Sequence, residues 1–204
     1  MNTHSYILLD SSGSMLADRA TTLDAVNEYM TSLPKGARVT ICAFDTDMAG
    51  ALRYQTLRNK VKRSETLTPA DYNPSGTTPL YDAILRAVKH LDVDPDNAKA
   101  RVSLVIVTDG LENSSREGTK EGVRSLLKQR QEESDWLVLY LGADHDAFAE
   151  AGKIGIDLGH TVTYTKSKTR ETLRATSRMA TMHASGITAM GLNYTDEERE
   201  DAKE

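Results

Sequence analysis

Short apolar runs alternate along the chain with longer segments in which apolar residues recur every three or four positions. Six runs have the length of β-strands: residues 6–9, 38–44, 51–57, 102–107, 136–141 and 161–164. The runs at 102–107 and 136–141 are almost continuously apolar, which is typical of central parallel strands that are covered on both faces. The run at 51–57 is more polar and follows a turn-like segment, so we expect an antiparallel strand at the sheet edge.

The segments between the runs have the period of amphipathic helices. They cover approximately residues 23–33, 80–91, 123–127, 144–152 and 168–183, and the last of them has the weakest apolar face. We expect Thr78 to cap the second helix, with Pro79 at its first helical position. The fourth helix is predicted to open at 144–146 and to turn Phe148 and Ala151 inward.

This alternation predicts an α/β fold, a doubly wound and mostly parallel six-stranded sheet with one antiparallel edge strand and helices on both faces. With 204 residues and 39% hydrophobic content, the chain can bury one substantial core. We therefore expect a single domain over residues 1–193. Residues 194–204 are mostly charged, so we expect this tail to fray.

Composition narrows the class of protein. The net charge of −5 disfavours a nucleic-acid partner, although two basic stretches, at 53–63 and 166–178, could form a phosphate-binding face. The single cysteine, Cys42, excludes an internal disulfide and is expected to be a buried, inert thiol. The first residues do not resemble a signal peptide, and no apolar stretch is long enough to span a bilayer. We expect a cytoplasmic protein with no membrane partner.

Oxygen-bearing side chains gather in three places along the chain. Asp10, Ser12 and Ser14 follow the first apolar run and alternate, so an extended backbone points all three the same way. Thr78 precedes the second helix, and Asp109 follows the run at 102–107. In an open α/β sheet, ligands collect beyond the carboxyl ends of the strands. Oxygen ligands with few carboxylates suit a hard cation such as Mg²⁺.

In this order, Asp-x-Ser-x-Ser, a distant Thr and a distant Asp resemble the metal-ion-dependent adhesion site of the von Willebrand factor type A (VWA) domain. The segment 136–144 is also similar to the fifth-strand region of short intracellular members from bacteria and phages. The resemblance covers most of the chain and implies the Rossmann-like VWA fold.

The resemblance also implies how the metal is held. Ser12 and Ser14 coordinate Mg²⁺ directly, and Thr78 and Asp109 alternate between direct and water-bridged contact. Asp10 acts mainly through water and accepts hydrogen bonds from the serine hydroxyls. Mn²⁺ or Ca²⁺ are the expected substitutes.

Two carboxylates and three neutral hydroxyls leave such an ion able to accept another anionic oxygen. The resemblance implies that an Asp or Glu of a protein partner supplies it, and that binding is coupled to a shift of the last helix, 168–183. The loops around Asp45, Tyr72 and Ser114 are expected to contact the partner. The sequence thus predicts a metal-dependent protein-interaction module. A metal-dependent homo-oligomer, in which the metal face binds a second copy of the chain, stays open as an alternative.

Catalytic motifs are missing from the sequence, so we do not expect an enzyme. Ser12 stands where an aspartyl phosphotransferase needs a second acid, and neither Ser12 nor Ser14 lies in a G-x-S-x-G elbow. Dinucleotide-binding and P-loop motifs are also missing. His145 lies between two aspartates but has too few His or Cys neighbours for a zinc site. A metal-dependent hydrolase is the less favoured alternative.

Overall fold

A computed structural model describes residues 2–144 and 146–203, and His145 lies outside them. Its sheet contains β1 (Thr3–Asp10), β2 (Arg38–Thr46), β3 (Leu52–Lys62), β4 (Arg101–Thr108), β5 (Leu137–Ala143) and β6 (Thr161–Tyr164). The strand order is β3-β2-β1-β4-β5-β6. β3 runs antiparallel to β2, and the other neighbouring pairs are parallel. The predicted α/β fold with one antiparallel edge strand is confirmed.

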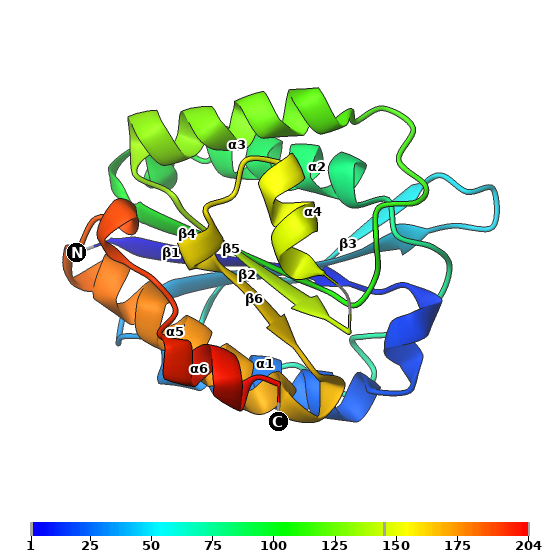
Figure 1. Ribbon diagram of the computed structural model, residues 1–204, viewed down its shortest axis with the longest axis horizontal. Helices are drawn as coiled ribbons and strands as arrows, with labels where there is room; N and C mark the ends of the chain where they lie inside the picture. The colour runs from blue at the N-terminus through cyan, green and yellow to red at the C-terminus, as the bar shows by residue number, and fades with distance from the viewer. Residues whose placement is uncertain (1, 145, 204) are drawn as a thin grey trace.

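Helices cover both faces of this sheet (Figure 1). They are α1 (Arg19–Ser32), α2 (Leu80–Asp92), α3 (Lys120–Ser134), α4 (Ala147–Lys153), α5 (Thr169–Ser185) and α6 (Asp196–Asp201). α2, α3 and α4 lie on one face, and α1, α5 and α6 lie on the other (Figure 1). Among the described residues, no helix is both long and apolar enough to cross a membrane.

The sheet separates two apolar cores. Because side chains alternate along a strand, Ile7 and Leu9 of β1 pack on the side of α1 and α5, while Tyr6 and Leu8 pack on the side of α2. All eight residues of β1 and all seven of β5 are buried, as expected for central strands covered on both faces. β3 has only one buried residue, which fits its position at the edge.

Two local expectations for the helices are wrong. Pro79, and not Thr78, occupies the N-cap position of α2, since the Pro79 carbonyl accepts the Ala83 backbone N–H at 3.0 Å and α2 begins at Leu80. In α4, Ala147 and Ala151 are buried, but Phe148 is only partly buried and lies 5.0 Å below the Arg199 guanidinium.

The charged tail differs from the expectation of fraying. Thr195 and Glu198 form a capping box that starts α6, each side chain accepting a hydrogen bond from the other residue's backbone N–H. Glu198 also forms two hydrogen bonds with Arg178 of α5, at 2.6 and 2.8 Å, and Ala202 is fully buried. Residues 196–201 therefore pack on the domain as a helix.

Candidate metal centre

Backbone hydrogen bonds bring the three predicted loops together at the carboxyl edge of the sheet. Ser75 N–H donates to the Ser11 carbonyl at 2.7 Å, and Gly13 N–H donates to the Gly76 carbonyl at 3.1 Å. These bonds join the loop after β1 to the segment that leads into α2. Asn113 joins the loop after β4 to the same segment, since its backbone N–H donates to the Thr78 carbonyl at 3.2 Å.

Asp10 lies at the bottom of this loop cluster and is completely buried. Its Oδ1 accepts the Ser12 backbone N–H at 2.8 Å, and its Oδ2 accepts the Thr108 hydroxyl at 2.6 Å. Burial raises the pKa of the Asp10 carboxyl to about 6, although the hydrogen bonds from Thr108 and Ser12 lower it. A nearby cation would therefore stabilise a charged form that burial disfavours.

The other four predicted residues lie around Asp10. The Ser12 and Ser14 hydroxyl oxygens are 3.1 Å apart, and the Ser14 hydroxyl donates to Asp109 Oδ1 at 2.7 Å. Thr78 reaches the cluster beside Gly110. A Cβ placed on Gly110 would lie 3.0 Å from Thr78 Oγ1 and 4.0 Å from Asp10 Oδ2. The structure thus gathers all five residues in one place.

Three supporting residues were not found from the sequence. Asp82, in the first turn of α2, accepts the backbone N–H groups of residues 116–118 at 2.8, 3.0 and 2.5 Å. Glu112 accepts the backbone N–H groups of Tyr81, Ser114 and Ser115 at 2.7–2.9 Å. Both carboxylates hold the loop that carries Asp109 against α2. The Thr108 hydroxyl donates to Asp10, and its position directly before Asp109 was the only feature of the sequence that pointed to a role for Thr108 in the site.

The loops around Asp45, Tyr72 and Ser114, which are expected to contact a partner, contain both buried and exposed side chains. Tyr72 is buried and donates its hydroxyl to the Asp10 carbonyl at 2.5 Å, and Asp45 is buried against Arg53. Large apolar side chains are exposed on three segments at this edge, and they are Leu16, Met48 and Leu111. Met48 lies in the turn between β2 and β3, and the other two follow the Ser14 and Asp109 loops closely.

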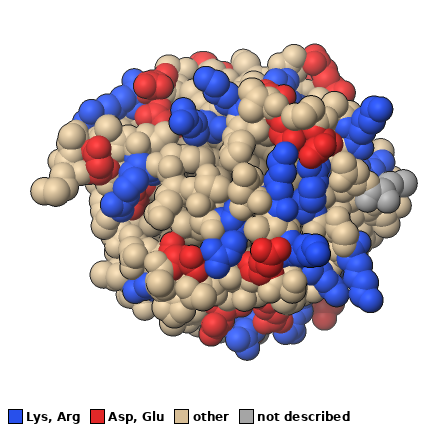
Figure 2. Space-filling view, turned by 180° about the vertical axis from the view of Figure 1, so that it is seen from behind, with Lys and Arg blue, Asp and Glu red and all other residues tan. Residues whose placement is uncertain are grey.

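Most of the basic residues proposed for a phosphate-binding face pair with acids. The pairs include Arg53–Asp45, Arg58–Asp71, Lys60–Asp94, Lys166–Asp109, Arg170–Glu28, Arg174–Glu28 and Arg178–Glu198. Figure 2 shows acidic and basic side chains interspersed over one face of the molecule. These pairs reduce the positive charge that phosphate binding requires.

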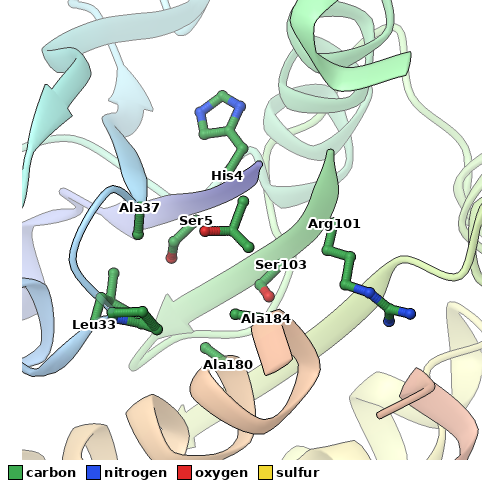
Figure 3. A pocket seen from close by; sticks show the side chains of 10 residues that line it. His4, Ser5, Leu33, Ala37, Arg101, Ser103, Ala180 and Ala184 are labelled. Atoms are coloured by element: carbon green, nitrogen blue, oxygen red, sulfur yellow. The ribbon is translucent and has the colours of Figure 1, made fainter. Parts of the chain in front are cut away.

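Two cavities lie away from the loop cluster. The one in Figure 3, where Ser5 and Ser103 of neighbouring strands face Ala180 and Ala184 of α5, measures about 10 Å³, close to the size of one water. A groove of about 940 Å³ lies at the amino ends of β5 and β6, with acidic, basic and apolar residues in its wall. Neither contains a residue of the predicted metal site.

The sequence profile of the von Willebrand factor type A domain matches residues 6–112, just over half of the chain. The chain belongs to this family, whose domains are generally interaction modules rather than enzymes. A comparison with curated protein sequences found no match.

Solved structures share the fold. A von Willebrand factor type A protein from Catenulispora acidiphila has a TM-score of 0.62 and 15% identity over 88% of this chain, which spans only 43% of that protein. Manganese-loaded TRAP protein of Plasmodium vivax has a TM-score of 0.60 and 16% identity over 83% of this chain and 70% of its own. The SpRpn10 VWA domain has a TM-score of 0.57 and 15% identity, with 93% and 100% of the two chains covered. Because the sequence identities are only 15–16%, the similarity to these structures establishes the shared fold and nothing about function.

Gly76 provides a test of the loop packing. It has φ +69°, and a Cβ there would collide with the Thr46 backbone and lie 2.8 Å from Thr46 Oγ1. We expect Gly76→Ala to lower the free energy of unfolding by about 2 kcal/mol or more, measured by urea denaturation. Gly36→Ala is the matched control, because Gly36 has φ +89° but no atom within 4 Å of the added Cβ. Gly36→Ala should lower the free energy of unfolding by only about 1 kcal/mol. Equal decreases for the two variants would contradict the predicted clash at Gly76.

Proposed function

We propose that this chain is a metal-dependent protein-binding module. Asp10, Ser12, Ser14, Thr78 and Asp109 hold one divalent cation, Mg²⁺ under cellular conditions, with Mn²⁺ or Ca²⁺ as substitutes. The ion accepts a carboxylate oxygen from an Asp or Glu of a protein partner. The observation that carries this proposal is the meeting of two buried carboxylates and three hydroxyls from loops far apart in the sequence.

The chemistry of the donor set fits a divalent cation. All five side chains offer oxygen, the donor that Mg²⁺, Mn²⁺ and Ca²⁺ accept. The Asp10 side chain is fully buried and that of Asp109 is 1% exposed, so two negative charges lie out of water. Burying carboxylates is costly unless cations or hydrogen bonds compensate. A divalent ion would supply two positive charges where the loops converge.

The residue roles follow from the contacts. Asp10 already accepts one protein hydrogen bond on each oxygen, which supports a role through water and not as a direct ligand. Ser12, Ser14 and Thr78 would bring neutral hydroxyls to the ion. Because hydroxyls do not neutralise its charge, the ion keeps its attraction for a carboxylate from outside the chain.

The surroundings of the site support a protein as the partner. Leu16, Met48 and Leu111 are 56%, 108% and 50% exposed at this edge of the sheet. Exposed apolar side chains beside a polar centre are common at protein-binding surfaces. They would bury apolar area of the partner while the ion binds its carboxylate.

Metal-dependent capture tests this function. Calorimetry with Mg²⁺ should show one site, and proteins retained by the immobilised chain in Mg²⁺ or Mn²⁺ should be lost in EDTA. Thr78→Ala should lose both the metal and the retained proteins while keeping its circular dichroism spectrum. Thr31→Ala, which removes an exposed hydroxyl at the end of α1, is the control and should behave as wild type. A partner that binds equally well in EDTA would exclude the proposed mechanism.

A further inference from the structure

A lysine side chain reaches into the proposed metal site. Lys166 belongs to the short connection between β6 and α5, 152 residues from Ser14 in the sequence. Its ammonium lies 2.7 Å from Asp109 Oδ2 and 3.4 Å from Asp18 Oδ2. It also donates to the Ser14 carbonyl at 3.2 Å. One ammonium therefore joins the loop after β1, the loop after β4 and the start of α5.

The ammonium contacts the same side chain that the metal is proposed to use. The two oxygens of Asp109 are divided between the Ser14 hydroxyl on Oδ1 and Lys166 on Oδ2. A divalent ion at this carboxylate would repel an ammonium a few ångströms away, and burial strengthens the repulsion. Asp109 cannot keep both cations at close range without an electrostatic cost.

We propose that Lys166 is a built-in competitor of the divalent cation: its ammonium and the metal bind Asp109 in turn. This inference rests on the proposed metal site. Lys166 lowers the affinity of the site for the metal, and metal binding releases Lys166 from Asp109. The site thus exchanges a tethered monovalent cation for a free divalent one.

The exchange also acts on the last long helix. Lys166 stands three residues before Thr169, where α5 begins, and Glu28 of α1 pairs with Arg170 and Arg174 of α5. In the Lys166-bound form, the start of α5 is tied to two of the three metal-holding loops, those after β1 and β4. Release of Lys166 removes that tie and leaves the Glu28 pairs in place. Metal occupancy therefore controls how firmly the β6–α5 connection is held.

Charge-matched variants test the competition. Lys166→Met should bind Mg²⁺ about tenfold more tightly than wild type, which corresponds to a Lys166-bound form populated in about nine molecules of ten. Lys166→Arg keeps the cation and should stay close to the wild-type affinity. Lys128→Met makes the same change of charge on the exposed surface of α3, where Lys128 pairs with Glu132, and should also keep the wild-type affinity.

A second measurement follows Lys166 in the unaltered protein. Acetylation of lysines, resolved by mass spectrometry, should be slow at Lys166 in EDTA because its ammonium is paired and only 26% exposed. Saturating Mg²⁺ should make Lys166 react several-fold faster, while exposed Lys35 reacts at one rate throughout.

The outcomes separate this inference from the proposed function. Equal Mg²⁺ affinity of wild type and Lys166→Met, or equal acetylation of Lys166 with and without Mg²⁺, would overturn the competition and leave the metal site standing. Mg²⁺ binding by Lys166→Met alone would support the competition in its strongest form. Absence of binding to both folded proteins would overturn the metal site and the competition together.

Discussion

Asp10→Ala is expected to weaken Mg²⁺ binding by about a hundredfold, which in a calorimetric titration appears as loss of the binding signal. The variant removes one of the two buried carboxylates and frees the Ser12 backbone N–H and the Thr108 hydroxyl that Asp10 accepts. Without Asp10, the serine loop loses both its negative charge and its orientation. Asp24→Ala, which removes an exposed carboxylate from α1, is the control and should bind as wild type.

Loss of Mg²⁺ binding should not be accompanied by loss of the fold. The two apolar cores lie on the faces of the sheet, whereas the five candidate ligands lie at its edge. We therefore expect the far-ultraviolet circular dichroism spectrum to be the same in Mg²⁺ and in EDTA, and for Asp10→Ala as for wild type. Unchanged metal affinity in a folded Asp10→Ala protein would end the proposal for this site.

The central strands could be predicted because burial on both faces requires nearly continuous apolar residues. β4 and β5 have this pattern, and both are interior strands, β4 between β1 and β5, and β5 between β4 and β6. The edge strand β3 was recognised by its polar residues, but its length was underestimated. Its pairing with β2 shifts register between Val39 and Cys42, and the strand continues to Lys62. Such irregular pairing depends on the neighbouring strand and not on local pattern.

The weak apolar face of α5 also has a tertiary explanation. Thr172 and Thr176 are buried on this helix, and their hydroxyls donate to backbone carbonyls four residues earlier at 2.9 and 2.7 Å. Hydrogen-bonded threonines can take core positions that a count of apolar residues assigns to solvent. α6 was misjudged for a similar reason, since its charged residues bond to α5 and to their own helix start.

The five candidate ligands could be predicted because their order along the chain resembles that of a known family. The groups around them could not, since each depends on contacts between distant segments. Asp82 bonds to backbone 34 to 36 residues away, and Lys166, which follows the edge strand β6, reaches Asp109 at the end of the interior strand β4. In the sequence, both look like ordinary surface charges.

A histidine far from this site gives the second large expected effect, on stability against pH. His4 is buried at the start of β1, where its ring nitrogens lie 2.8 Å from Asn97 Oδ1 and from Thr40 Oγ1. Burial lowers the pKa of His4 from 6.5 to about 4, and nearby Arg38 and Lys60 act in the same direction. The hydrogen bond to Asn97 and the charge of Asp94 oppose this change.

As the pH falls below 6.5, the unfolded chain protonates at His4 before the folded protein does, so the folded state loses stability until about pH 4. Between pH 7.5 and 4.5, the free energy of unfolding should therefore fall by about 2 to 3 kcal/mol more for wild type than for His4→Gln, measured by urea denaturation in EDTA. Glutamine keeps a hydrogen-bonding side chain but does not titrate. The other titrating groups are common to both proteins, so their contributions cancel in the difference. Parallel stability curves for the two proteins would show that the folded state accepts a proton at His4 as readily as the unfolded chain.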